Sequence, residues 1–440
     1  MMWSGFAVFR RSAYPARVTS LAPIGQRDRV CSPGQIVRTL VLFALFCAGL
    51  MVASVHARAQ EAAPVSEAQF RAFVSNLWPD ARKAGVSRAT FDAALGGLTP
   101  DASVITITGK QSEFVKPIWH YINGAVSKQR LERGDARAKE FEKTLARIES
   151  KHGVDRYVVL AVWGMETNYG GFSGKLSTVR SLATLAASGY RGTFFRDELI
   201  VALQILEQGH IEPENMLGSW AGAMGQTQFM PSSFMKYAVD WDGDGHKNIW
   251  TSATDALAST ANYLAEHGWI RDWTWGYEVL LPQGFSLLKY EPNVERHFTE
   301  WARAGVKIAD GSTMPKTGEA TLILPAGKHG PAFLVTKNFQ TIKAYNTSTA
   351  YALGVALLSD RLAGTDGLVG KWPVQERMPD AEQSLEIQKH LVRIGYDIGK
   401  LDGKIGEKAQ SAIRQFQRKA GLEPDGFANL ALLERLRRAN

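Results

Sequence analysis

Residues 158–171 read VVLAVWGMETNYGG, and the fold can be worked out from this stretch. Its apolar side chains predict a largely buried helix that ends at the glycine pair, with Glu166 as its one carboxylate. Burial without a cation raises the pKa of a carboxyl group and keeps it protonated near neutral pH. A general acid needs this state. From this stretch alone, a Glu at the exposed end of a core helix fits equally well, because structural ion pairs also bury carboxylates.

The composition of the chain indicates a folded protein of two or three domains, with 440 residues, 45% hydrophobic and 10% aromatic. The formal net charge is +8, but the first 59 residues hold seven Arg, no Lys and one acid. Only +2 therefore remains for residues 60–440, which argues against a nucleic-acid partner. Cys31 and Cys47 also lie among the first 59 residues. The remainder is expected to have no disulfide, thiolate nucleophile or cysteine metal site.

The N-terminal segment 1–59 has the pattern of a leader. Residues 40–55, LVLFALFCAGLMVASV, form an apolar run that follows Arg38 and precedes the Ala-Arg-Ala sequence ending at Ala59. A positive flank, a short apolar run and a small-x-small site predict an export signal cut after Ala59. The alternative is a retained membrane anchor, for which the run is slightly short.

Most of the chain after the leader has helical periodicity. Two amphipathic sets lie within residues 64–129, and further helices are predicted at 129–150, 158–167, 177–187, 196–208, 255–267 and 347–362. Two β-prone runs, 321–324 and 333–336, flank a segment that begins and ends with Pro and predict a small β-hairpin. The fold class expected for this part is therefore mainly α.

The C-terminal part is expected to be a separate module. Residues 371–383 are polar, contain Pro and read as a linker. Residues 384–440 hold three short amphipathic segments and two similar turns, at Asp402-Gly403 and Asp425-Gly426. Asp-Gly supplies the positive φ that a tight turn needs. A compact three-helix module is predicted.

An EF-hand-like calcium loop is predicted at residues 240–250, DWDGDGHKNIW. Positions 1, 3 and 5 of the loop are Asp240, Asp242 and Asp244. Gly245 occupies position 6, where the loop must turn sharply. Position 12 is Thr251 in place of the usual Glu, and Asp255 could replace that ligand. His246 would offer its backbone carbonyl. The alternative is an Asp-Gly-rich surface turn without an ion.

A third stretch, residues 219–234, reads SWAGAMGQTQFMPSSF and sets polar groups among small and apolar residues. Ser219, Gln226 and Gln228 could orient a sugar through hydrogen bonds while aromatic side chains pack on its CH faces. A buried loop is the alternative. Three tyrosines from distant parts of the sequence, Tyr121, Tyr263 and Tyr345, could each belong to a core or to the rim of a site.

These motifs occur together in an order that resembles a known family. GMETNYG at 164–170, GSWAGAMGQTQFMPSSF at 218–234, DWDGDG at 240–245 and ANYLAEHGW at 261–269 resemble the lytic murein transglycosylase B family. The resemblance runs from about residue 64 to residue 362. Residues 384–436, with Phe416-Gln417 and the two Asp-Gly turns, resemble a peptidoglycan-binding domain.

The resemblance implies a lysozyme-like catalytic domain at residues 60–370, with Glu166 as its catalytic residue. It implies substrate contacts from Ser219, Gln228, Tyr263, Tyr345 and Tyr121. It implies a structural Ca²⁺ ion held by Asp240, Asp242, Asp244 and His246, with Asp255 as the later carboxylate. No organic cofactor is expected. The implied partner is the peptidoglycan glycan strand, and the expected location is the periplasm. We also expect a monomer, with proteins of cell-wall synthesis or remodelling as further partners.

The implied reaction breaks the β-1,4 bond between N-acetylmuramic acid and N-acetylglucosamine. Glu166 acts first as acid and then as base, and the muramic acid 6-hydroxyl closes on the anomeric carbon to give a 1,6-anhydro end. Ordinary glycoside hydrolysis uses two carboxylates. A hydrolase that uses water therefore stays open if Asp197 or Glu198 approaches Glu166. A non-catalytic wall-binding scaffold is the other alternative, favoured if Glu166 is salt-bridged or far from any cleft.

Overall fold

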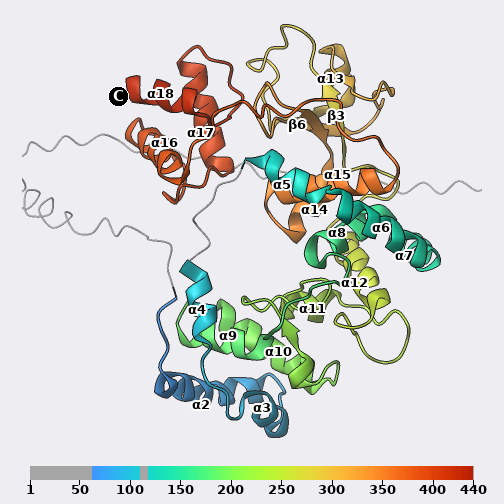
Figure 1. The fold of residues 1–440 in the computed structure, drawn as a ribbon, viewed down its shortest axis with the longest axis vertical. Coiled ribbons are helices and arrows are strands. Elements are labelled where there is room, and N and C mark those ends of the chain that lie inside the picture. Colours follow the sequence, from blue (N-terminus) through green and yellow to red (C-terminus); the bar gives the residue numbers. More distant parts are fainter. Residues whose placement is uncertain (1–61, 110–116, 440) are drawn as a thin grey trace, which may run out of the picture. The chain divides into compact units, whose positions relative to one another are not determined.

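The computed structural model describes residues 62–109 and 117–439 (Figure 1). The expected leader, its apolar run and the cut after Ala59 lie outside these residues. No helix in the described ranges is long and apolar enough to cross a membrane. The fold is mainly helical, as predicted.

The first group of helices precedes the five-stranded sheet in sequence. It consists of α2 (Glu67–Lys83), α3 (Arg88–Leu95), α4 (Ala102–Gly109), α5 (Ile118–Ala125), α6 (Lys128–Glu140), α7 (Glu142–His152), α8 (Arg156–Thr167), α9 (Thr178–Ala187), α10 (Phe194–Glu207), the 3₁₀ turn η2 (Pro213–Asn215), α11 (Pro231–Tyr237) and α12 (Ala253–Glu266). Later helices are α13 (Phe298–Arg303), α14 (Lys337–Tyr345), α15 (Thr349–Leu362), α16 (Ala381–Arg393), α17 (Glu407–Lys419) and α18 (Leu430–Arg438).

Polar residues at the helix starts explain many of these boundaries. Ser66 and Gln69 form a capping box at α2, and the Asp155 carboxylate accepts hydrogen bonds from the Tyr157 and Val158 backbone N–H groups at the start of α8. Ser348 caps α15 in the same way. Each such side chain satisfies backbone donors that a helix leaves unpaired at its first turn.

Two hydrophobic cores hold the helices that surround the Glu166 stretch. One is built by residues of α7, α8, α12, α14 and α15, and α8 and α15 lie side by side (Figure 1). The other is built by residues of α2, α3, α9, α10 and α11. Tyr263 and Tyr345 pack against both cores. The two tyrosines therefore mark the junction at which a site can form between the cores.

The predicted β-hairpin is confirmed as the centre of a larger sheet. Strands β6 (Glu319–Ile323) and β7 (Ala332–Val335) pair antiparallel, with Leu322 opposite Leu334. Three strands that the sequence pattern did not reveal complete the order β4-β6-β7-β3-β5: β3 (Gly276–Leu280), β4 (Glu295–His297) and β5 (Lys307–Ile308). A second ladder pairs β1 (Leu176–Ser177) with β2 (Leu217–Gly218).

The helix expected at 129–150 is divided in the structure. Phe141 separates α6 from α7 at the N-cap position of the latter, without a side-chain capping bond, and its ring packs edge-on against Trp163 at 5.7 Å between centroids. The charged sequence predicts one helix, but the helix is interrupted at the residue that makes this contact with α8. Helix α14, which follows β7, was not predicted from the sequence.

Three helices form the C-terminal module, α16, α17 and α18, around their own core. Buried Gln388 and Gln417 each bond an Asp-Gly turn, since Gln388 Oε1 accepts from Gly403 N at 2.8 Å and Gln417 Oε1 from Gly426 N at 2.9 Å. Helix α16 begins at Ala381, inside the range expected to be linker.

The segment before the module and the module itself contact the rest of the chain. Trp372 packs against the core that contains α8, although the sequence reads there as linker. Arg418 lies 3.0 Å from the Glu291 carboxylate, and Asp425 accepts a hydrogen bond from the Lys328 backbone at 3.1 Å. These contacts dock the module in the structure.

Candidate active site

Glu166 lies in the last turn of α8, where the buried part of the helix ends. The helix interior from Val158 to Gly164 is buried, as the sequence predicts, while Glu166 itself is half-buried. The C-terminal end of a helix carries partial negative charge, which disfavours an ionised carboxylate. The position therefore favours the protonated acid.

One hydroxyl group bonds the Glu166 carboxyl. Tyr351, in the first turn of α15, donates a hydrogen bond to Glu166 Oε1 at 2.5 Å. Burial raises the pKa of Glu166 to about 7, and the Tyr351 bond acts in the opposite direction because it stabilises the carboxylate. A carboxyl group with this pKa can give and take a proton at neutral pH.

The backbone after Glu166 has an uncommon conformation. Asn168 and Tyr169 both have positive φ angles, 52° and 61°, and Gly170 follows at 75°. The Tyr169 ring folds back onto α8, where a Cβ atom on Gly164 would lie 2.6 Å from it. Glycine at 164 is therefore required for this packing. The folded-back ring fixes the helix end that carries Glu166.

A hydrogen-bond network joins the end of α8 to the stretch 219–234. Gln226 Oε1 accepts from the Trp163 indole at 3.0 Å, and the Gln226 backbone carbonyl accepts from Thr167 Oγ1 at 3.0 Å. Gln226 Nε2 donates to the Trp250 carbonyl at 3.2 Å. Buried polar groups satisfied in this way hold a single arrangement. Gln226 thus connects α8 to the end of the acidic loop.

Gln228 and Ser219 hold the wall formed by this stretch. Gln228, with a φ of 52°, donates from Nε2 to the Ser173 carbonyl at 3.0 Å and to the Gly225 carbonyl at 2.9 Å. Ser219 Oγ accepts from the Ala223 backbone at 3.0 Å. The side-chain amide of Gln228 thus donates to two backbone carbonyls, while the Ser219 and Gln228 side chains remain partly exposed.

The three tyrosines expected at the site lie on different elements near Glu166. Tyr345 donates to the Thr227 carbonyl at 2.8 Å, and its ring centroid lies 4.8 Å from that of Tyr263. Burial, followed by the Glu166 charge, raises the pKa of Tyr345 and of Tyr121. Tyr121 is 41% exposed and is therefore accessible from solvent. The structure brings Tyr345 and Tyr121 to Glu166, and Tyr263 joins them through Tyr345.

A cavity of about 1770 Å³ opens beside α8. Tyr121 and Met165, the residue before Glu166, line it together with Arg130 and Lys343. Residues of the C-terminal module, among them Arg414 and Phe427, line it as well. This space exceeds the roughly 300–1000 Å³ of typical small-molecule sites. Glu166 and the stretch 219–234 are not among the residues that line it.

The two carboxylates considered as partners of Glu166 have other roles. Glu198 is buried and accepts from Ser232 twice, from the backbone N at 2.9 Å and from Oγ at 2.7 Å. It therefore caps the start of α11. Asp197 is exposed and lies 3.4 Å from Arg196. Neither perturbs the pKa of Glu166, which responds to burial and to the Tyr351 bond.

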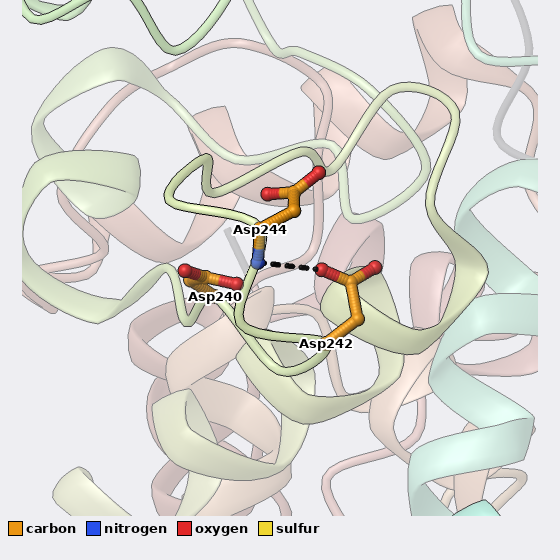
Figure 2. Close-up of side chains that lie close together, drawn as sticks. All are labelled: Asp240, Asp242 and Asp244. Carbon is orange, nitrogen blue, oxygen red and sulfur yellow. Dashed lines mark hydrogen bonds between the residues drawn. The ribbon is translucent and has the colours of Figure 1, made fainter.

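Three carboxylates of the acidic loop converge. One oxygen from each of Asp240, Asp242 and Asp244 lies within 4.8 Å of the other two, and Figure 2 shows the side chains around the turn of the loop. The Asp244 backbone N–H donates to Asp242 Oδ1 at 3.4 Å (Figure 2). An all-oxygen set of this kind fits a hard divalent cation such as Ca²⁺. The donor set present therefore suits the expected ion.

The carboxylate of Asp255 is not part of this group of three. Asp255 is fully buried, and its two oxygens accept from the Trp241 and Asn248 backbones at 2.9 and 2.8 Å. It closes the loop by joining its two ends. The exposed His246 donates from its backbone N to Asp244 Oδ1 at 2.8 Å.

Comparison with known proteins assigns the family. The transglycosylase SLT domain model matches residues 69–360, about two thirds of the chain. The chain belongs to the transglycosylase SLT domain family. A peptidoglycan binding domain model matches residues 380–436. The two matches agree with the resemblance seen in the sequence, and the helical SLT domain with a C-terminal helical module confirms the expected fold class.

Solved and curated relatives of this SLT-domain chain are lytic transglycosylases. SltB3 from Pseudomonas aeruginosa, solved with NAG-anhNAM-pentapeptide, is 43% identical with a TM-score of 0.80, and the match covers 84% of this chain and 99% of that chain. Slt35 from Escherichia coli in complex with calcium is 28% identical with a TM-score of 0.56, and the match covers 71% of this chain and 98% of that chain.

The membrane-bound lytic murein transglycosylase B of Escherichia coli (strain K12) is 35% identical over 231 residues, which are 51% of this chain. The match spans 61% of that relative's length.

One residue of this SLT-domain site was missed in the sequence. Tyr351 bonds Glu166 directly, yet the two positions are 185 residues apart. The available signal was chemical, because Tyr351 is the one aromatic residue in the small and apolar sequence TAYALGVALLSDRL of α15. A hydroxyl-bearing aromatic in a buried helix needs a hydrogen-bond partner.

Proposed function

We propose that this chain is a lytic transglycosylase that cleaves the β-1,4 bond between N-acetylmuramic acid and N-acetylglucosamine in peptidoglycan and leaves a 1,6-anhydro-muramic acid end. The observation that carries the proposal is the Glu166 carboxyl, which has a pKa of about 7 and a hydrogen bond from Tyr351. The residue before it lines the large cavity. SltB3 was solved with a fragment that contains an anhydro sugar, which supports this product.

In the first step, protonated Glu166 gives its proton to the glycosidic oxygen, and the bond from that oxygen to the muramic acid anomeric carbon breaks. The N-acetyl carbonyl of the substrate stabilises the positive charge that develops at this carbon. Glu166, now a carboxylate that accepts the Tyr351 hydrogen bond, takes the proton from the 6-hydroxyl as that oxygen bonds the anomeric carbon. Glu166 ends protonated, and no water is consumed.

The geometry favours this route over hydrolysis. An inverting hydrolase needs a second carboxylate about 6.5–9.5 Å away to activate water, and a retaining one needs a nucleophile about 5–5.5 Å away. Glu198 is used by Ser232, and Asp197 is exposed beside Arg196. A non-catalytic scaffold fits poorly as well, because Glu166 accepts from a tyrosine and forms no ion pair with a cation in the described residues.

The remaining parts of the chain support the same function. Ca²⁺ would be held by Asp240, Asp242 and Asp244, with the closed loop fixing the segment after residues 219–234; a calcium complex of Slt35 supports this assignment. The ion would supply rigidity and take no part in bond cleavage. The C-terminal module would bind peptidoglycan strands, and the place of action would be the periplasm.

The test is mass spectrometry of products released from purified peptidoglycan by residues 60–440. We expect products lighter by one water than the hydrated muropeptides. Glu166→Gln should keep fold and glycan binding but lose cleavage, since the amide cannot cycle a proton. Asp197→Asn, the matched acid-to-amide control, should cleave at the wild-type rate. Reducing ends would indicate a hydrolase, and wild-type rates from the Glu166→Gln variant would remove the assignment.

A further inference from the structure

An exposed aromatic side chain lies beside the end of the catalytic helix. Phe172 is 64% exposed, whereas Phe194, another exposed Phe, is 41% exposed. Among the described residues, Phe172 packs against neither of the two helical cores, nor against the core of the C-terminal module or that of the five-stranded sheet, and it stacks on no other ring. Packing within the described residues thus gives no reason for an aromatic side chain at this position.

The backbone around Phe172 is held firmly next to Glu166. The Phe172 backbone N–H donates to the carbonyl of Thr167, the residue after Glu166, at 3.0 Å. The Gly170 backbone donates to Thr167 Oγ1 at 3.1 Å, and the Ser173 carbonyl accepts from the Gln228 side chain at 3.0 Å. These bonds on both sides place Phe172 at a fixed position close to the end of α8.

The same segment continues into the wall opposite α8. A Cβ atom on Gly174 would lie 2.0 Å from the Gly218 carbonyl, so the two backbones touch where only glycine fits. Strand β1 then pairs Leu176 with Gly218. The Phe172 backbone therefore lies between the end of the Glu166 helix and the wall that carries Ser219 and Gln228.

We propose that Phe172 is a sugar-stacking residue that forms a glycan-binding subsite next to Glu166. The inference rests on the proposed function, because a glycan strand must pass Glu166 for its bond to be cleaved there. One face of a pyranose ring is lined by C–H groups and packs on an aromatic face, which the exposed phenyl ring supplies without a hydrogen bond of its own.

Stacking of this kind acts on binding. The subsite lies to one side of the bond that breaks, so it holds substrate and transition state equally and affects KM with little effect on kcat. A phenyl ring also contacts only one face of the sugar and makes no contact with substituents on the other edge, such as stem peptides. The segment 170–174 should thus contribute to binding of glycan strands that lack stem peptides as well as to binding of substituted strands.

The experiment measures kcat and KM on soluble, peptide-free glycan strands for the full mature chain. Phe172→Ala and Phe172→Leu should each raise KM about tenfold with kcat within twofold of wild type. Phe172→Trp should keep the wild-type KM. The control is Leu288→Ala, which removes an apolar side chain that is 61% exposed on the sheet part of the chain, and should match wild type. Binding of the same strands to Glu166→Gln, with and without Phe172→Ala, gives the affinity without turnover.

Three results would overturn the inference. One is a Phe172→Ala variant with unchanged KM. Another is a Phe172→Leu variant that binds glycan as wild type does, since an aliphatic side chain would then replace the aromatic ring without loss of affinity. The third is a fall in kcat and in the melting temperature at constant KM, which a structural role would produce. The product masses test the proposed function separately, so either idea can fail while the other stands.

Discussion

Removing the Tyr351 hydroxyl should move the pH range over which the enzyme is active. Tyr351→Phe deletes the donor that bonds Glu166 Oε1 at 2.5 Å and keeps the ring in its buried place. The bond stabilises the carboxylate and so lowers the pKa of Glu166, which burial raises to about 7. Without the bond, burial acts unopposed and the pKa rises further. Because the first step needs the protonated acid, activity should persist to higher pH.

The size of the change follows from the hydrogen bond. A hydrogen bond to a charged group contributes about 1.5–3 kcal/mol. Since about 1.36 kcal/mol corresponds to one pKa unit, the alkaline limb of the pH profile should move up by about one to two pH units. The measurement is kcat/KM on soluble glycan strands across the neutral and alkaline range. Below the limb, kcat/KM of the variant should fall, because the carboxylate that forms when Glu166 gives up its proton has lost the hydrogen bond that stabilises it.

Tyr345→Phe is the matched control for this prediction. Tyr345 is partly buried near the Glu166 charge, but its hydroxyl donates to the Thr227 carbonyl. The control should leave the alkaline limb in place, whatever it does to KM. An alkaline limb that stays fixed or moves to lower pH in Tyr351→Phe would refute the reasoning, because it would show that the Tyr351 bond does not stabilise the Glu166 carboxylate.

Three further predictions concern stability and binding. Ca²⁺ at a hundredfold excess over its Kd should stabilise the fold by about 2.7 kcal/mol and so raise the melting temperature above that measured with chelator. Asp242→Asn should reduce this difference, and equal wild-type midpoints with Ca²⁺ and with chelator would count against a tight site. Tyr169→Phe should leave the free energy of unfolding in denaturant unchanged or raise it by about 1 kcal/mol, because the Tyr169 hydroxyl is buried without a partner in the described structure. A clear fall in the free energy of unfolding would mean that the hydroxyl is bonded. Deletion of residues 371–440 should weaken binding to sacculi more than it slows cleavage of short glycans, and should lower the melting temperature because Trp372 is lost from the main core; equal losses in binding and cleavage would contradict the tethering role.

The parts of the fold that were predictable have local causes. The buried α8 follows from an apolar run between Asp155 and the glycine pair, and the centre of the sheet follows from two β-prone runs around a turn. The three converging Asp residues follow from loop spacing alone. Strands β4 and β5 were not predictable, because three and two residues give no alternation to read.

The parts of the site that were not predictable depend on long-range contacts. The pairing of Tyr351 with Glu166 and the use of Glu198 by Ser232 join elements that are distant in the sequence. The hydrogen bonds that the two Asp255 oxygens accept from the Trp241 and Asn248 backbones could not be read from loop spacing either. Sequence spacing identifies which residues can act, and the packing of α8 on α15 decides which of them meet.

A single carboxyl group must serve as both acid and base in the proposed reaction, and its surroundings explain how. A deeply apolar site would hold the acid protonated and make the second proton transfer slow, whereas a cation would keep it ionised and prevent the first. Burial and the C-terminal end of α8 raise the pKa of Glu166, and the hydrogen bond from the Tyr351 hydroxyl lowers it. The hydroxyl stabilises the carboxylate without adding a charge, so the pKa stays near the pH at which both transfers proceed.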